Sequence, residues 1–127
     1  RAGRADDDWA WLQSRIVETF RNTSRAFYDD IAASTVGRLV MVSSSTVETP
    51  GWGNANYAAS KAAAEAWAEA AAAGFAKAGT AASVILVVRS LGSAEGATSV
   101  DTLAQRVATL WDEPANKLNG ARLRLAT

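Results

Sequence analysis

Apolar and polar residues alternate along the chain in blocks that predict helices and strands in turn. Between residues 9 and 33, apolar side chains recur every three to four positions or at multiples of that spacing, as on one face of a helix: Leu12, Ile16, Phe20, Phe27 and Ile31. Aliphatic runs at 38–43 and 82–88 suit strands that are buried on both faces. Helices are predicted over 56–77, which is rich in alanine, and over 100–111.

Charged residues and turn formers mark the ends of these blocks. Residues 1–8 read as a tail or loop, and an aspartate among Asp6, Asp7 and Asp8 is expected to cap the first helix. Pro114 and the pair Asn119-Gly120 indicate turns before a last short strand at 121–126. The order α-β-α-β-α-β predicts an α/β fold with a parallel sheet of three strands and right-handed crossovers. Three strands make a thin sheet, so we expect part of a larger domain.

Composition excludes several classes of site. The 127 residues carry 13 basic and 13 acidic side chains, so charge does not suggest a nucleic acid or an anionic membrane as partner. The sequence has no cysteine and no histidine, which excludes disulfides, histidine-based acid–base catalysis and most zinc sites, and we expect no metal. No signal peptide or membrane-spanning run is visible, so the expected compartment is the cytoplasm.

The stretch GWGNAN, residues 51–56, is a near match to a dinucleotide-binding loop. The match fails because Asn56 replaces the last glycine and because the preceding strand ends near Ser43, too far upstream. That fingerprint needs glycine directly at the turn from strand to helix, where the backbone approaches a pyrophosphate. We therefore expect no pyrophosphate loop in this sequence.

Tyr57 and Lys61 are the more informative pair. Residues four apart share a helix face, so the Lys61 ammonium can lie near the Tyr57 phenol. A nearby positive charge favours the phenolate and lowers a pKa that starts near ~10. Such a tyrosine can exchange a proton at neutral pH. Taken alone, the pair also fits a tyrosine at a helix start beside a solvated lysine.

The context of this pair resembles the short-chain dehydrogenase/reductase family. The matching stretches are GRLVMVSSS for a strand, YAASKAAAEAW for the following helix, ASVILVV for a later strand and DEPANKLNGARLRLAT for the closing turn and strand. The family places a serine about thirteen positions before the tyrosine, which is Ser44 here, with Ser43 and Ser45 as supporting neighbours. The resemblance implies a Rossmann-like fold and hydride transfer between NAD or NADP and a small carbonyl or alcohol.

The resemblance also implies the residue roles. Tyr57 is the general acid or base, Ser44 bonds to the substrate oxygen, and Lys61 acts on Tyr57 and contacts the nicotinamide ribose, so Tyr57 and Lys61 also bind cofactor. Only the latter half of the family's domain is matched, without its glycine-rich loop or the residue that selects NAD or NADP. We therefore interpret residues 1–127 as the C-terminal half of such a domain, a fragment that is inactive and binds no cofactor in this form.

Two positions depart from the family pattern. Counting back from Ser44 puts Ile16 where the family commonly has an asparagine that holds a relay water, and isoleucine cannot bond a water. Arg89-Ser90 stands where the family usually has Pro-Gly beside the nicotinamide. Trp52, in the loop between Ser44 and Tyr57, is a candidate for the wall of a substrate pocket. The other four tryptophans are interpreted as packing residues.

Two other interpretations stay open at this point. One is a non-catalytic assembly module, in which helices 9–33 and 56–77 pair across a two-fold axis, because small alanine side chains permit close helix approach. Such pairing predicts a homo-oligomer, whether the protein is an enzyme or an assembly module. The other is an α/β domain without a function in this form.

Overall fold

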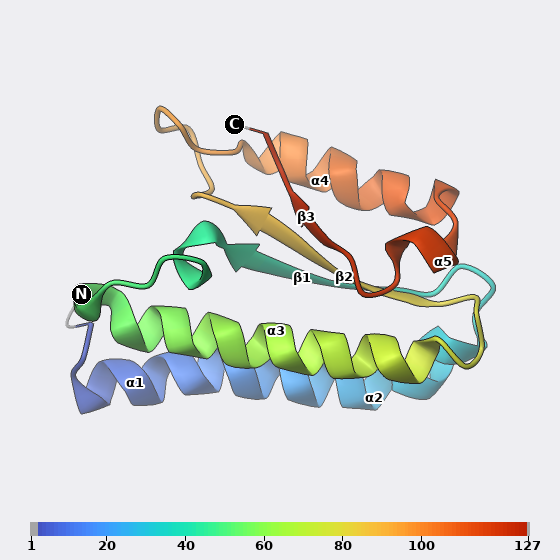
Figure 1. Ribbon diagram of the computed structural model, residues 1–127, viewed down its shortest axis with the longest axis horizontal. Coiled ribbons are helices and arrows are strands. Elements are labelled where there is room, and N and C mark those ends of the chain that lie inside the picture. Colours follow the sequence, from blue (N-terminus) through green and yellow to red (C-terminus); the bar gives the residue numbers. More distant parts are fainter. Residues whose placement is uncertain (1–2, 127) are drawn as a thin grey trace.

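The computed structural model describes residues 3–126, and its elements follow the predicted alternation (Figure 1). The strands are β1 (Arg38–Ser44), β2 (Ala82–Val88) and β3 (Arg122–Arg124). The helices are α1 (Asp6–Leu12), α2 (Thr19–Ala33), α3 (Ala55–Phe75), α4 (Val100–Thr109) and α5 (Ala115–Leu118). The α/β class is therefore confirmed. The short helix α5 is an addition that the sequence pattern did not predict.

The three strands form one parallel sheet in the order β1-β2-β3. All seven residues of β1 pair with β2, from Arg38 opposite Ala82 to Ser44 opposite Val88. β3 pairs with the stretch from Ile85 to Val87 on the other side of β2. Because the strands are parallel, their carboxyl ends meet at one edge of the sheet, on the left in Figure 1.

Two layers of helices enclose the sheet. The helical segment 6–33 and α3 lie side by side on one face, and α4 and α5 cover the other (Figure 1). On the first face Met41, Ile85 and Val87 pack against two alanines of α3, whose small side chains let the helix lie close to the strands. On the second face residues of β2 pack against Leu110 and Leu118. The sheet thus separates two apolar layers.

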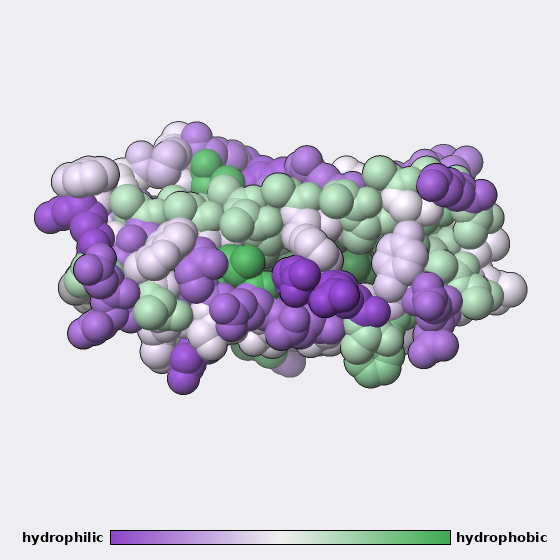
Figure 2. Space-filling model, turned by 90° about the horizontal axis from the view of Figure 1, so that it is seen from below, coloured by the Kyte–Doolittle hydropathy of each residue, from purple (hydrophilic) through white to green (hydrophobic). Residues whose placement is uncertain are grey.

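The outer side of the first layer carries much alanine. α3 leaves these alanines exposed: Ala59, Ala62, Ala63, Ala66, Ala70 and Ala73. Figure 2 views the molecule from the side of these helices, and weakly hydrophobic surface runs along its length next to hydrophilic clusters. Shallow grooves remain between α2 and α3, one of them lined by Tyr28 and Trp67.

The first helix differs from its prediction in its periodicity. A π-helical turn, Gln13–Glu18, lies between α1 and α2, and such a turn adds a residue to the helical repeat. Phe27, a member of the predicted apolar stripe, is 55% exposed, and Tyr28 instead stacks on Phe75 with ring centroids 4.8 Å apart. The rest of the predicted stripe does face the core: Leu12, Ile16, Phe20 and Ile31.

The start of this helix also differs. The helix begins at Asp6, with Ala5 at the N-cap position and no capping side chain, so the predicted aspartate cap is wrong. Asp6, Asp7 and Asp8 occupy the first turn, where their carboxylates face the partial positive charge of the helix end. Part of the predicted tail, residues 1–2, lies outside the described residues.

The two long strands differ in burial. All seven residues of β2 are buried, as predicted for a strand covered on both faces. In β1, by contrast, Leu39, Val40 and Val42 are only half-buried, because no strand among residues 3–126 pairs with its outer edge. The prediction of a strand is right for β1, and the prediction of full burial is wrong. None of the described helices is long and apolar enough to cross a membrane.

Candidate active site

Ser44 is the last residue of β1 and lies at the carboxyl edge of the sheet, opposite Val88 of β2. In open α/β sheets, ligands bind outside this edge. The Ser44 side chain is buried, its Oγ accepts a hydrogen bond from the Thr46 amide at 3.1 Å, and it donates one to the Thr46 Oγ1 at 3.0 Å. Because a hydroxyl has a single proton, Ser44 must turn from Thr46 to donate to a substrate oxygen.

Tyr57 and Lys61 lie one turn apart in the first turns of α3, as the sequence predicted. The Lys61 Nζ is 5.9 Å from the centroid of the Tyr57 ring. It also donates a hydrogen bond of 2.9 Å to the carbonyl oxygen of Val42. Lys61 is therefore close to Tyr57 and bonded to the strand that ends two residues later at Ser44.

Burial changes the electrostatics of Lys61. Desolvation lowers the pKa of its ammonium below the ordinary value of 10.5, and the Glu65 carboxylate, one turn further along α3, opposes that shift. The proton on Lys61 is accordingly easier to remove than that of a solvated lysine. A partly buried cation acts more strongly on a neighbouring phenol than an exposed one, because less water screens it.

Ile16 and Lys61 line the same hollow beside the outer edge of β1, together with Phe20 and the stretch from Val40 to Val42. Ile16 lies within the π-helical turn, a feature that is frequent at functional sites. Ile16 and Lys61 are therefore close neighbours, and the role of position 16 stays a prediction. Its aliphatic side chain contributes no hydrogen bond there.

Trp52 lies in a short 3-10 turn, Trp52–Asn54, and is 76% exposed. It lines an apolar hollow between the loop and α3, together with Val47, Pro50 and alanines of the helix. The Arg4 guanidinium lies over its ring, 5.2 Å from the centroid. None of the lining residues is Ser44, Tyr57 or Lys61, so the role of Trp52 in a substrate pocket stays a prediction.

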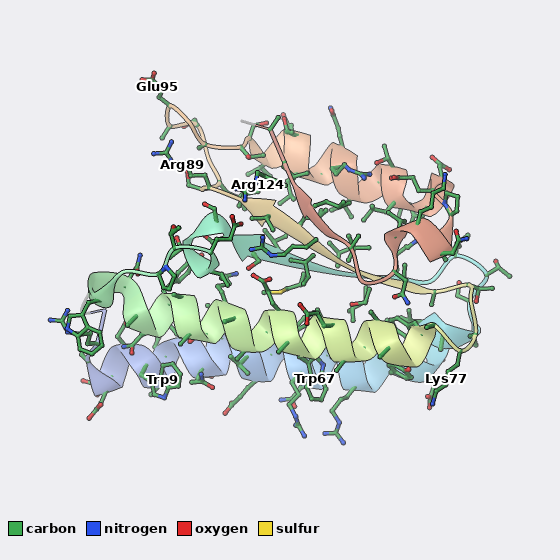
Figure 3. The ribbon with its side chains drawn as sticks, in the orientation of Figure 1. Trp9, Trp67, Lys77, Arg89, Glu95 and Arg124 are labelled. Atoms are coloured by element: carbon green, nitrogen blue, oxygen red, sulfur yellow. The ribbon has the colours of Figure 1, made fainter. Side chains whose placement is uncertain are left out.

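After β2 the chain forms a loop that closes on itself. Figure 3 shows Arg89 and Arg124 near the carboxyl ends of β2 and β3. The Thr98 amide donates a 2.8 Å hydrogen bond to the carbonyl oxygen of Ser90, and Gly92 and Gly96 have positive φ angles. This loop is not a turn from strand directly into helix. Among residues 3–126, no glycine-rich turn of that kind is present, nor any group of three acidic, histidine or cysteine side chains that could hold a metal.

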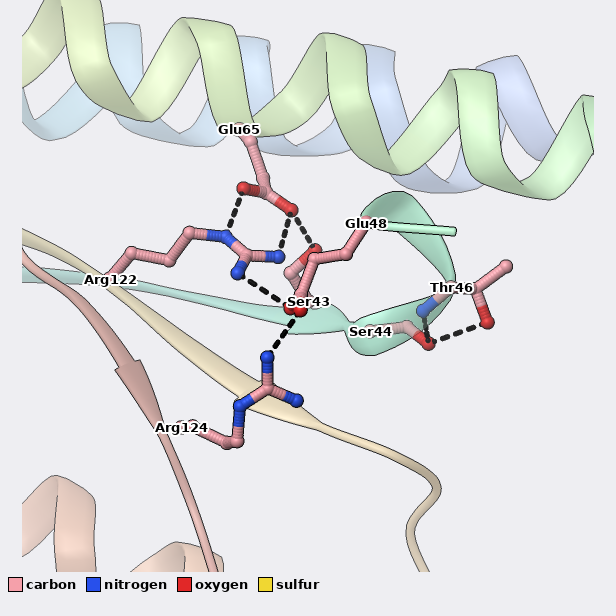
Figure 4. Close-up of polar contacts among 7 residues, drawn as sticks. All are labelled: Ser43, Ser44, Thr46, Glu48, Glu65, Arg122 and Arg124. Carbon is pink, nitrogen blue, oxygen red and sulfur yellow. Dashed lines mark hydrogen bonds and ion pairs between the residues drawn. The ribbon is translucent and has the colours of Figure 1, made fainter. Parts of the chain in front are cut away.

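The sequence interpretation missed a charged network at the same edge. Glu65 on α3 is buried and contacts Ser43 and Arg122, and Glu48 in the loop after β1 pairs with Arg122 and Arg124 (Figure 4). One signal was available, since Glu65 lies eight residues after Tyr57 on the face that also carries Lys61. The alternation Arg-Leu-Arg in the last strand also places both arginines on one face of the sheet.

Comparison with known proteins identifies the family and the fold. The family model for short chain dehydrogenase matches residues 4–111. The chain belongs to the short-chain dehydrogenase family. No curated protein matches the sequence significantly.

Solved dehydrogenases have the same fold. Acetoin dehydrogenase from Enterobacter cloacae has a TM-score of 0.80 at 19% identity over 95% of this chain and 54% of its own. Gluconate 5-dehydrogenase from Burkholderia cenocepacia, in complex with NADP and tartrate, has a TM-score of 0.79 at 19% identity over 96% of this chain and 56% of its own. For NAD+-bound xylitol dehydrogenase the TM-score is 0.81 at 17% identity, over 96% and 60%. This chain therefore spans little more than half the length of these enzymes.

Proposed function

We propose that this segment carries the catalytic side of an NAD(P)-dependent oxidoreductase that interconverts a carbonyl and an alcohol. The observation that carries the proposal is the position of Lys61, beside Tyr57 and bonded to the strand that ends at Ser44. Membership of the short-chain dehydrogenase family supports it. Two of the similar solved structures hold NADP and NAD+, which supports a nicotinamide cofactor, and the choice between them stays open.

In this proposal each of the three side chains has one task. Tyr57 gives its phenolic proton to the substrate oxygen during reduction and removes it during oxidation. Ser44 turns from Thr46 and donates its hydroxyl proton to the same oxygen, which stabilises the charge that develops there. Lys61 keeps positive charge beside the Tyr57 ring and thereby favours the phenolate. A bound nicotinamide supplies or accepts the hydride.

Full activity in this proposal requires a pyrophosphate-binding segment that these 127 residues do not contain. Tyr57 and Lys61 alone offer too few contacts to hold a dinucleotide, because most of its orientation comes from the glycine-rich turn and the helix behind it. We therefore expect the 127-residue chain to show no micromolar binding of NADH or NADPH in calorimetry. Micromolar affinity would contradict this part of the proposal.

The decisive experiment measures turnover in a protein that joins this segment to a cofactor-binding half. Tyr57→Phe should lower the rate by at least roughly 10²–10⁴-fold, the contribution of a positioned general acid. Ser44→Ala should cost roughly 10²–10³-fold, the scale of one lost donor to a developing oxyanion. Tyr28→Phe is the matched control, because Tyr28 is the other tyrosine of the chain and stacks on Phe75 in the core. Near-normal turnover of Tyr57→Phe would exclude the proposal.

A homo-oligomer formed through helices 9–33 and 56–77 is also part of the proposal. The exposed alanines of α3 and the exposed aromatic side chains Trp11 and Phe27 on the neighbouring helix support it, because such surface is commonly buried by association. A non-catalytic assembly module would use the same surface. Intact Ser44, Tyr57 and Lys61 favour the enzyme.

A further inference from the structure

Glu65 is an unusual residue for its position. It projects from the alanine-rich helix α3 toward the sheet, between the buried alanines Ala64 and Ala68, and only 9% of its side chain is exposed. A buried carboxylate is costly unless hydrogen bonds and an opposite charge compensate the water that it loses. Its partners therefore indicate what the residue is for.

Glu65 has partners on two strands. The Ser43 hydroxyl on β1 donates to Oε2 at 2.6 Å. From β3, the Arg122 guanidinium donates through Nε to Oε1 at 2.8 Å and through a second nitrogen to Oε2 at 3.3 Å. Two parallel bonds between a guanidinium and a carboxylate fix the direction of both groups. The carboxylate raises the pKa of Arg122 still further above its ordinary value, and the guanidinium is charged in any case.

The network continues from Arg122 into the loop after β1. A further nitrogen of Arg122 donates to the Glu48 carboxylate at 2.7 Å, and Arg124 pairs with the same carboxylate from its outer side (Figure 4). We call these five residues the ionic clamp: Ser43, Glu48, Glu65, Arg122 and Arg124. The clamp joins α3, the end of β1, β3 and the loop that leads from Ser44 toward Tyr57.

Two residues of the clamp flank Ser44 along the chain. One anchor, Ser43, directly precedes Ser44, and the other, Glu48, follows it by four residues. Between the two anchors the Ser44 side chain bonds to Thr46 and to no member of the clamp (Figure 4). The backbone on both sides of Ser44 is therefore tied to α3 and β3, whereas its hydroxyl is bonded only within the short turn that follows.

We propose that Glu65 and Arg122 are positioning residues for Ser44, which fix the end of β1 and the following turn so that the serine hydroxyl has one orientation. This inference rests on the role of Ser44 in the proposed function. Stability alone does not account for the arrangement, because replacement of a buried ion pair by well-packed apolar residues is often neutral or stabilising. Alanine at position 65 would match its neighbours on the helix. The clamp costs desolvation and gives a defined geometry beside Ser44.

The test observes Ser44 directly in the 127-residue chain by NMR. In the native chain we expect one χ1 rotamer for Ser44 from side-chain couplings, and slowed hydrogen exchange of the Thr46 amide, which donates to the Ser44 Oγ. Glu65→Gln keeps the size of the side chain and an acceptor for Ser43, but it removes the charge that holds Arg122. We expect Ser44 to populate several rotamers and the Thr46 amide to exchange roughly tenfold faster, the scale of one lost hydrogen bond.

Three further variants separate positioning from stability. Glu69→Gln changes an exposed glutamate one turn further along α3 and should leave Ser44 and Thr46 unchanged. Arg122→Gln should repeat the effect of Glu65→Gln from the opposite side of the pair. Amides of β2 serve as the internal reference for the whole fold, since this strand is fully buried. Glu48→Gln removes only the more exposed ion pairs of the clamp, those with Arg122 and Arg124. It should still raise the exchange rate of the Thr46 amide, so it is the variant to use if Glu65→Gln and Arg122→Gln do not fold.

A single Ser44 rotamer and unchanged Thr46 exchange in folded Glu65→Gln and Arg122→Gln would overturn the inference. If those two variants do not fold, unchanged Thr46 exchange in Glu48→Gln overturns it. This outcome is distinct from failure of the proposed function, which would be seen as normal turnover of Tyr57→Phe and does not depend on the rotamer of Ser44.

Discussion

β1 and β2 have the same length and a similar aliphatic sequence, but their surroundings differ. All seven residues of β2 are buried between two neighbouring strands and two layers of helices. β1 has β2 on one side, and most of its residues before Ser43 are half-buried. An apolar run therefore predicts a strand well, but its place in the sheet depends on neighbours that come from elsewhere in the sequence.

The two strands are also stabilised by different interactions near their carboxyl ends. Val87 of β2 packs in the apolar core. Residues 42 and 43 of β1 instead bond to Lys61 and Glu65 of α3. Packing tolerates many similar side chains, whereas hydrogen bonds and ion pairs require one geometry. The candidate site lies at the end of the strand that polar contacts hold.

The largest expected effect is the loss of stability that a cavity beside β2 causes. Leu86→Ala should lower the free energy of unfolding by about 2–5 kcal/mol, because Leu86 is fully buried between β1, β3 and the helices of the second layer. Leu39→Ala in half-buried β1 should cost less than half as much. Urea unfolding, followed by circular dichroism, measures both. Equal losses of unfolding free energy in the two variants would show that β1 and β2 contribute equally to stability, which would contradict the difference described above.

The sequence predicted the elements and their order better than their details. Aliphatic runs located β1 and β2. The spacing of Ser44, Tyr57 and Lys61 selected the candidate site, and the roles of these residues stay a prediction. The exposure of Phe27 was not predictable from the helical period, because Phe27 lies in the same regular helix α2 as Phe20 and Ile31 and at a helical spacing from both. Glu65 and Arg122 lie 57 residues apart. Their pairing could not be predicted from local sequence, because it depends on the sheet that places β3 beneath α3.

A smaller effect is expected at the exposed alanines of α3, where the proposed contact between two copies lies. If helices 9–33 and 56–77 join two copies, Ala66→Glu places a charge in the contact, because Ala66 is exposed on α3. We expect a weaker dimer, with a dissociation constant at least roughly tenfold higher, since an unpaired buried charge costs more than 1.4 kcal/mol. Light scattering at several concentrations measures the change.

Ala104→Glu is the matched control for this prediction, since it introduces the same charge at an exposed position of α4, on the opposite layer. It should leave association unchanged. A folded monomer of the native chain at micromolar concentration would rule out the proposed contact.

The smallest expected effect is a loss of local order in acid at the end of β1. Hydrogen bonds from Arg122 and Arg124 hold the pKa of Glu48 below its ordinary value of 4.5. A carboxyl group with a lowered pKa in the folded state stabilises that state fully above 4.5, and this contribution is lost as the pH falls through the lowered value. Amides from Ser44 to Glu48 should therefore lose protection, relative to their intrinsic exchange rates, as the pH falls below 4.5, while β2 amides stay protected.

Two variants separate this effect from general acid unfolding. Glu48→Gln should remove the pH dependence at residues 44–48, because an amide does not titrate in this range. Glu113→Gln should leave it in place, although hydrogen bonds from Arg106 also lower the pKa of Glu113, because that pair joins α4 to the turn before α5 and shares no residue with the clamp at the end of β1. Loss of protection in β2 and at the end of β1 at the same pH would contradict this prediction. The end of β1 would then be no more sensitive to protonation than the packed strand β2.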